Sequence, residues 1–448
     1  MVPGRQPARD DGAMGLSVLE REVVAAVERS QGELVDLLGA LIAFDTVTHE
    51  PGAPAREEAA LQAFLARRLS ARGARVTVSE PDAAVVAGHP MVPDGFTFTG
   101  RPQLVARFPG AGGGRTLLLN GHVDVVDVRP RAAWASDPFR ALVSGGEVWG
   151  RGACDMKGGV ACMVFAAEVL AECGVRLAGD LIVNTVTEEE STGAGGLVSA
   201  RTVKADAAIV PEPSALAVWL ACRGSLLARI EVRGRAGHAG LPPRSPDDGG
   251  AVNAIEKTAY LIDAIRRLRK DWALRPRHRY LSAADCVPTI VSGGEWLVSY
   301  PATCTLDCHI EYLPDATGDP AAAVQRDFET WIARAADADP WLRANPPRVE
   351  WLSGAVPPAE IPETEPVVET LVAVEQDLGR HARIGGLDNW HDGATLVTEA
   401  GIPAVCYGPG DIYLAHTTEE RVPIGDLVAC AQGIALAALR FCGTTNSL

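Results

Sequence analysis

Apolar residues follow helical spacing at the start of the chain and later form short continuous runs. Apolar positions at i, i+3 and i+4 share one face of a helix, and they predict helices within 17–44 and over 56–72, 158–172, 366–378 and 424–439. Short apolar or alternating segments bounded by turn residues predict strands over 74–79, 103–108, 116–119, 181–187 and 207–211. Helices that alternate with strands in this way favour an α/β fold.

Composition and charge restrict the classes of partner. The chain has 448 residues and a net charge of −16, and its basic residues form no extended block, so nucleic acid and anionic membranes are not expected partners. No run approaches the roughly 18 apolar residues of a membrane span. Residues 1–16 are polar and rich in Pro, Gly and Arg, which predicts a disordered leader rather than a signal peptide.

The ten cysteines also carry information about the compartment. Most lie inside apolar segments, as expected for buried thiols in a reducing, cytoplasmic environment. Cys304 and Cys308 form the only close pair, and no second pair completes a zinc knot. We therefore interpret them as structural thiols.

Polar residues with metal-binding chemistry follow several of the predicted strands. His122 and Asp124 come directly after the run 116–119, and ligands of α/β sheets bind at the carboxyl ends of strands. Further candidates are Asp155 before a helix, three glutamates after 181–187, Glu212 after 207–211, and His416. Each has an ordinary explanation when considered alone: a structural histidine, an N-cap, or solvated carboxylates.

Taken together, these segments resemble the M20 family of metallopeptidases and amidohydrolases, which includes acetylornithine deacetylase, succinyl-diaminopimelate desuccinylase, aminoacylase-1 and glutamate carboxypeptidases. The matching stretches, in chain order, are GHVDVV, W-x-x-DPF, GRGACDMKGG, TEEESTGAGG, VPEPS, GHAG, YGPG and AHTTEE. The resemblance extends from about residue 34 to the C-terminus. Several ordered blocks make it specific, although each block alone is weak.

The resemblance implies a role for each matched position. His122, Asp155 and Glu212 would hold one zinc ion, and Asp155, Glu189 and His416 a second, with Co²⁺ or Mn²⁺ as substitutes. Glu188 would be the general base, and Asp124 would orient His122. Imidazole and carboxylate ligands suit zinc, and two such ions can activate a shared water and polarise a carbonyl.

His238 in GHAG has a separate implied role. In the family, a histidine at this place reaches the active site of the partner subunit and stabilises the oxyanion. The alternative is a loop histidine without a role, which we consider less favoured because the surrounding residues also match.

The resemblance also implies two domains. A catalytic domain with a mixed sheet flanked by helices would comprise 17–220 and 341–448. An inserted α+β lid and dimerisation domain would comprise 221–340, and its strand–helix–strand–strand–helix order supports this. We therefore expect a homodimer.

One departure from the family pattern concerns the substrate. Many members grip a substrate carboxylate with an arginine where this chain has Glu311, which reverses the local charge. Either Arg223 or Arg244 takes over that task, or the substrate is cationic or lacks a carboxylate nearby. On the second interpretation, Glu311 would favour a substrate amine.

The sequence thus predicts a zinc-dependent amide hydrolase that removes an acyl group from a small N-acylated amino acid or amine. A dipeptidase or carboxypeptidase with the same centre is the nearest alternative. A metal-binding protein without activity is a more distant one, since the five ligands and Glu188 are all present.

Overall fold

A mixed sheet of nine strands runs through the larger domain of the computed structural model, which describes residues 15–48, 54–315 and 318–445. Eight strands follow one path, β1-β2-β6-β3-β7-β17-β8-β15, and the ninth, β16, pairs with β8. In that order the strands are Arg75–Ser79, Gln103–Phe108, Leu181–Val186, Leu117–His122, Ala207–Val210, Ala404–Cys406, Val218–Cys222 and Ala359–Glu360, with β16 at Ile384–Leu387. The predicted mixed sheet is confirmed.

Three central strands of this sheet determine where polar side chains meet. β3 pairs in parallel with β6 on one side and with β7 on the other, and His122 at the end of β3 lies opposite Val186 at the end of β6. The residues of all three strands are buried. Because parallel strands end at the same edge of a sheet, the segments that follow β3, β6 and β7 meet there.

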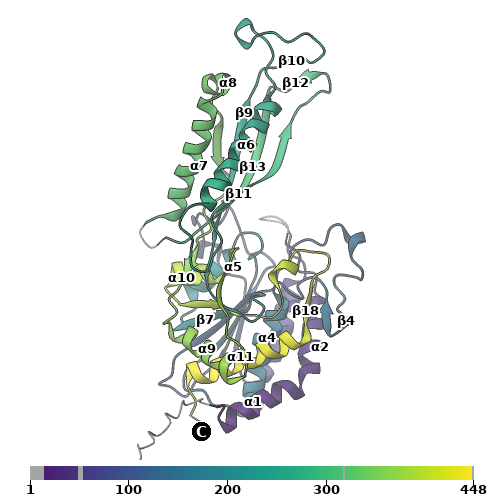
Figure 1. Cartoon of the computed structure of the whole chain (residues 1–448). Helices are drawn as coiled ribbons and strands as arrows, with labels where there is room; N and C mark the ends of the chain where they lie inside the picture. The colour runs from purple at the N-terminus through teal and green to yellow at the C-terminus, as the bar shows by residue number, and fades with distance from the viewer. Residues whose placement is uncertain (1–14, 49–53, 316–317, 446–448) are drawn as a thin grey trace, which may run out of the picture.

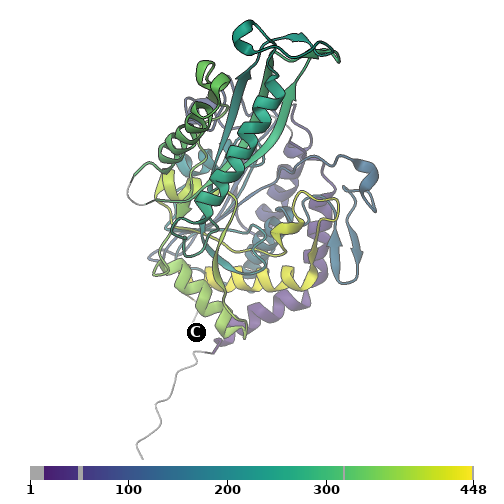
Figure 2. The same cartoon turned by 45° about the horizontal axis from the view of Figure 1, so that its top comes forward.

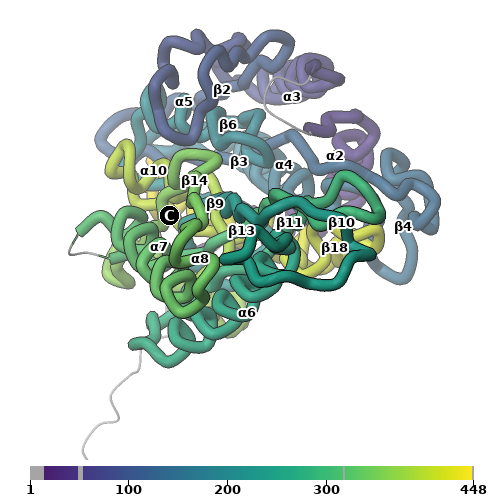
Figure 3. The backbone as a smooth tube through the Cα atoms, turned by 90° about the horizontal axis from the view of Figure 1, so that it is seen from above, coloured from purple at the N-terminus to yellow at the C-terminus, as the bar shows by residue number. Residues whose placement is uncertain are grey.

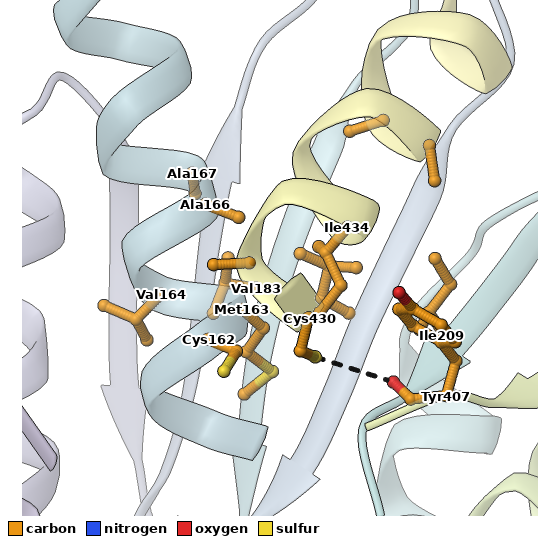
Figure 4. Packing of buried hydrophobic residues seen from close by; sticks show 14 of the residues in the cluster. Cys162, Met163, Val164, Ala166, Ala167, Val183, Ile209, Tyr407, Cys430 and Ile434 are labelled. Carbon is orange, nitrogen blue, oxygen red and sulfur yellow. Dashed lines mark hydrogen bonds between the residues drawn. The ribbon is translucent and has the colours of Figure 1, made fainter. Parts of the chain in front are cut away.

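Helices cover both faces of the central sheet. They are α1 Val18–Arg29, α2 Gln31–Ile42, α3 Glu58–Ala71, α4 Lys157–Glu172, α5 Ala194–Thr202, α9 Pro366–Asp377, α10 Gly393–Ala400 and α11 Ile424–Cys442. Figure 4 shows α4 and α11 packed together over the sheet, with Cys162 of α4 close to Cys430 of α11. The Cys430 thiol points toward the Tyr407 carbonyl.

α11 is longer and more apolar than the sequence analysis expected, since no segment there approached the length of a membrane span. Ile424–Cys442 is long and apolar enough to cross a membrane by length and composition, yet 67% of its apolar window is buried inside the protein. It contacts α4, α9 and α1, and Figure 1 shows it in yellow at the base of the larger domain. This is the pattern of a core helix.

The smaller domain, which we call the lid, rises above the larger one (Figures 1 and 2). Its sheet has the order β11-β13-β9-β14. These strands are Asp285–Gly293, Thr303–Tyr312, Gly224–Arg233 and Arg348–Trp351, and the lid helices are α6 Ala254–Ala273, α7 Pro320–Asp337 and α8 Pro340–Ala344.

Alternate residues of the lid strands build a second hydrophobic core. Even-numbered residues of β9 and β13, from Leu226 to Tyr312, are buried together with Leu261 of α6 and Phe328 of α7. Both helices cover the same face of the lid sheet, as the view from above shows (Figure 3). The opposite face carries the odd-numbered residues, among them His309 and Glu311.

The predicted end of the lid at residue 340 is too early. β14 pairs with β9 in antiparallel register from Arg348 to Trp351, so this strand completes the lid sheet instead of returning to the larger domain. The pairing partner of β14 was not predictable, because a four-residue strand that alternates between exposed and half-buried residues fits either sheet. Of the predicted leader, residues 1–14 lie outside the described residues.

Smaller elements complete the fold. β10 Gly237–His238 pairs with β12 Ser299–Tyr300 at the tip of the lid (Figure 1). A three-stranded sheet beside the larger domain contains β4 Leu142–Ser144, β5 Glu147–Trp149 and β18 Arg421–Pro423. The 3₁₀ helices are η1 Ala83–Val85, η2 Arg131–Ala133, η3 Pro246–Asp248 and η4 Ile412–Leu414.

Candidate metal centre

Two groups of possible metal ligands share one carboxylate at the sheet edge. The first contains His122, Asp155 and Glu212, and the second contains Asp155, Glu190 and His416; within each group the ligand atoms lie within 4.8 Å of one another. Asp155 lies between the two histidines. Its Oδ1 is 3.1 Å from His122 Nε2, and its Oδ2 is 3.4 Å from His416 Nε2. A shared carboxylate between two imidazoles is the arrangement that can bridge two cations.

Asp155 is held in place by a residue whose role sequence reasoning missed. The Glu420 carboxylate accepts the backbone N–H groups of Cys154 and Asp155, at 3.0 and 3.1 Å. It also forms an ion pair with Arg151, and both side chains are almost fully buried. Arg151 and Glu420 lie in two of the motifs quoted above, so their motif membership was the available signal.

The orientation of His122 comes from the main chain of Asp124. His122 Nδ1 lies 2.8 Å from the Asp124 carbonyl oxygen but 3.7 Å from its carboxylate. An Nδ1–H that donates to this carbonyl leaves the lone pair of Nε2 free for a cation. The predicted residue is therefore in the right place, but its carbonyl makes the contact, while its carboxylate accepts the Glu190 N–H at 3.1 Å.

The three consecutive glutamates take positions shifted by one from the predicted ones. Glu190 is the residue grouped with Asp155 and His416, where Glu189 was expected. Glu189 Oε2 lies 3.9 Å from His122 Nε2, at the centre but outside both groups. Glu188, the expected general base, instead places Oε1 2.7 Å from Arg101 Nε.

The physical reason for this shift is local backbone geometry. Glu188 has a φ of 71°, an uncommon conformation for a residue with a side chain, which turns the chain at the end of β6. Three identical adjacent residues give no pattern from which such a turn could be predicted. The assignment of Glu188 and Glu189 is therefore corrected to Glu189 and Glu190.

Charge in this cluster favours a bound cation. Burial raises the pKa of Glu189, Glu190 and Glu212, and neighbouring carboxylates raise it further. Hydrogen bonds to Asp155 and Glu190 raise the pKa of His416 to about 10. Buried carboxylates that repel one another are stabilised by a divalent cation, and a mixed carboxylate and imidazole set suits zinc, cobalt or manganese. The residues present therefore fit two metal ions.

Asp392, which the sequence analysis did not identify, is near enough to the centre to raise the pKa of Glu189 and Glu212. It is 1% exposed and neither carboxylate oxygen has a hydrogen-bond partner among the described residues. Burial raises its pKa to about 7. A Cβ on Gly196 would lie 2.0 Å from Asp392 Oδ1, so the glycine leaves room for this carboxylate.

The other predicted site residues lie in the lid or at its base. His238 is exposed on β10 at the lid tip, where its Nδ1 accepts the Gly240 N–H at 3.0 Å, and this chain does not bring it to the metal centre. Arg244 is exposed in the following loop. The roles predicted for His238, as an oxyanion donor, and for Arg244, as a carboxylate-binding residue, stay predictions.

Glu311 and Arg223 meet where the lid joins the larger domain. Arg223 Nε lies 3.8 Å from Glu311 Oε2, and its guanidinium donates to the carbonyls of Ala283 and Asp388. Glu311 Oε1 is also 3.1 Å from His309 Nε2. The carboxyl group therefore lies between one guanidinium and one imidazole, and Glu311 is 8% exposed. Its predicted contact with substrate stays a prediction.

Comparisons with known proteins identify relatives over most of the chain. The model of the family described as Peptidase family M20/M25/M40 matches residues 118–440. The chain is 30% identical over 426 residues to N-formyl-4-amino-5-aminomethyl-2-methylpyrimidine deformylase of Bacillus subtilis, covering 90% of this chain and 93% of that protein. It is 32% identical over 348 residues to acetylornithine deacetylase of Myxococcus xanthus, covering 76% and 84%.

Solved structures share the fold at lower identity. Human carnosine dipeptidase 1 superposes with a TM-score of 0.71 at 15% identity, covering 96% of this chain and 99% of that one. A tripeptidase of Staphylococcus aureus gives a TM-score of 0.67 at 21% identity, covering 91% and 98%. These two likenesses concern the fold alone.

Proposed function

Because the chain belongs to Peptidase family M20/M25/M40, whose members hydrolyse amide bonds, we propose that it is a zinc-dependent deacylase of small N-acylated amines. The family membership confirms the predicted resemblance and the predicted class of enzyme. The observation that carries the proposal is the pair of ligand groups joined by Asp155. We propose zinc as the native metal, with cobalt and manganese as substitutes.

Each residue at the centre has a distinct task. His122 and Glu212 would hold one ion, Glu190 and His416 the other, and Asp155 both. The bound ions supply Lewis acidity for a water molecule and for the amide carbonyl. Glu189, at the centre but outside both ligand groups, would take the proton of the attacking water and deliver it to the departing amine.

The proposal extends to the acyl group and the amine of the substrate. The deformylase that covers nine tenths of this chain is named for removing a formyl group from an aminomethylpyrimidine, an amine without a carboxylate. This chain carries Glu311 where carboxylate-binding relatives are expected to have an arginine, which supports an amine of the same kind. We therefore propose that the substrate carries a short acyl group, with formyl preferred, on a neutral or cationic amine.

A substrate panel tests this choice. Zinc-loaded protein should be assayed with the N-formyl and N-acetyl derivatives of 4-amino-5-aminomethyl-2-methylpyrimidine, with N-acetylornithine, and with dipeptides. We expect the highest kcat/KM for an N-formyl or N-acetyl amine without a carboxylate. Preference for dipeptides would refute the proposal and favour the peptidase alternative.

Two variants test the corrected assignment of the glutamates. Glu189→Gln should retain both metal ions and lose on the order of 10²–10⁴ in kcat, as expected for removal of a general base. Glu190→Gln should lower metal stoichiometry as well as activity, measured by elemental analysis after desalting. Metal loss in the Glu189 variant, with metal retained in the Glu190 variant, would reverse the two roles.

We also propose a cytoplasmic homodimer formed through the lid, without nucleic-acid or membrane partners. β11 is an edge strand of the lid sheet and exposes Val287, Ile290 and Val291, which are 38%, 58% and 52% exposed. An exposed apolar edge strand is a surface on which a second copy can pair. In such a dimer, His238 would reach the partner's metal centre. All ten cysteines are free thiols, which supports a reducing compartment.

A further inference from the structure

A buried arginine lies behind the three glutamates, on the chain segment that precedes the region matched by the family model. Arg101 comes just before β2, whereas the match begins at residue 118. Its side chain is 4% exposed. Its Nε lies 2.7 Å from Glu188 Oε1 and 3.7 Å from Glu58 Oε1, and both glutamate side chains are 1% exposed.

The segment before Arg101 has a hydrophobic core of its own, which fixes it against α5. Its buried residues include Val86, Phe96 and Phe98, and they pack on Leu197 and Val198 of α5. The rings of Phe96 and Phe98 meet edge to face at 4.9 Å. The Arg101 N–H donates to the Phe98 carbonyl at 2.8 Å, so the arginine is attached directly to this core.

Glu188 also holds together the turn formed by residues 188–193. Its carbonyl accepts the N–H groups of Thr192 and Gly193, at 3.1 and 2.7 Å, and its Oε2 accepts the Ser191 hydroxyl. One carboxylate oxygen thus faces Arg101 and the other faces the turn itself. Since the next two residues supply the proposed base and a proposed ligand, the anchor of Glu188 determines where they point.

We infer that Arg101 is a positioning residue, which acts through Glu188 to hold Glu189 and Glu190 at the metal centre. A buried carboxylate that loses its guanidinium partner is left with an uncompensated charge, and turning toward water lowers that cost. That movement would release Glu188 from its place and shift the turn that follows it.

The inference rests on the proposed metal-dependent function, but its main test needs no substrate. Cobalt(II) should be titrated into metal-free wild-type protein and into Arg101→Met, with visible absorption as the readout of the ligands around the ion. We expect the second cobalt ion to bind at least tenfold more weakly in Arg101→Met, with an altered spectrum. Arg101→Lys keeps the charge and should recover most of the affinity.

A double variant shows whether the effect passes through Glu188. In a Glu188→Gln background the ion pair is already absent, so Arg101→Met should weaken cobalt binding by less than threefold further. An equal loss in both backgrounds would overturn the inference, as would wild-type affinity and spectrum in folded Arg101→Met. If Arg101→Met does not fold, Arg101→Gln, which also removes the charge, takes its place in the same comparison.

Arg68→Met is the matched control. Arg68 Nη2 lies 2.7 Å from Glu168 Oε2, whose side chain is 4% exposed, and Glu168 lies about three turns from the start of α4 at Lys157. This variant removes a comparable ion pair and should lower the melting temperature while leaving cobalt affinity within twofold of wild type. A wild-type protein that bound cobalt but hydrolysed no amide in the panel would refute the proposed function alone. The positioning role would still be decided by the cobalt titrations.

Discussion

Replacing Glu311 by glutamine should stabilise the protein at pH 8 but not near pH 4.5. Glu311 is 8% exposed, and its Oε2 has no hydrogen-bond partner among the described residues. Burial raises its pKa from 4.5 to about 7, because Arg223 at 3.8 Å offsets only part of the cost of removing the charge from water. The carboxylate is therefore a destabilising group at neutral and higher pH.

The size and sign of the effect follow from proton linkage. The folded protein keeps the Glu311 proton up to about pH 7, whereas the unfolded chain releases it near pH 4.5. Between these values the folded state binds more protons, so the free energy of unfolding falls as pH rises and levels off above pH 7. At about 1.4 kcal/mol for each pH unit, this rise in pKa corresponds to at most about 3 kcal/mol.

Urea unfolding of wild type and Glu311→Gln at pH 4.5, 6, 7 and 8, followed by tryptophan fluorescence, measures this directly. The glutamine variant should gain stability relative to wild type by about 1–3 kcal/mol between pH 4.5 and 8. Glu350→Gln, an exposed glutamate of β14, is the control and should show no such trend. A difference between wild type and Glu311→Gln that stays constant over this pH range would refute the reasoning.

Three further predictions concern the metal ions, the dimer and the lid core. Chelation of the metals should lower the melting temperature, because an ion present at 100 times its dissociation constant stabilises the folded state by about 2.7 kcal/mol. An unchanged melting temperature after verified metal removal would contradict this prediction. His238→Ala should lose roughly 10²–10³ in kcat, and mixing it with Glu189→Gln should restore activity in heterodimers; no recovery after verified subunit exchange would argue against action across the dimer. Phe328→Ala should cost about 3–5 kcal/mol in unfolding of the lid with cobalt affinity unchanged, whereas a loss below 1 kcal/mol would show that the lid core does not depend on this ring.

The edge of the sheet where the metal centre lies was predictable because it depends on short-range patterns. Apolar runs that end in His122 or just before Glu212 mark buried strands with polar residues at their carboxyl ends. Parallel pairing then brings such ends together whatever the connecting segments are. His122 and Glu212 occupy their predicted group for this reason, whereas Asp155 and His416, which also occupy predicted groups, were identified from the motifs around them.

The features that sequence reasoning missed depend on long-range contacts or on local backbone conformation. The positive φ of Glu188 decides which of three identical residues faces the metals, and no spacing rule records it. Arg101 and Glu188, which form an ion pair, are 87 positions apart in the sequence. The Asp392 carboxylate fits beside Gly196 because that residue lacks a side chain. These contacts exist only once the sheet and its helices are assembled.

The residues around Glu311 change how this glutamate is interpreted. On sequence alone, a glutamate in place of a carboxylate-binding arginine suggested an acceptor for a substrate amine. In the structure Arg223 and His309 enclose that glutamate at the base of the lid, so the position presents neither a free cation nor a free anion. A glutamate at this position cannot bind a substrate carboxylate as an arginine would. The proposed preference for amines without a carboxylate therefore rests on the lack of a cation at residue 311, and it predicts that Glu311→Gln leaves the order of kcat/KM among cationic, neutral and anionic N-acyl substrates unchanged. A change of that order in the variant would show instead that Glu311 contacts the substrate.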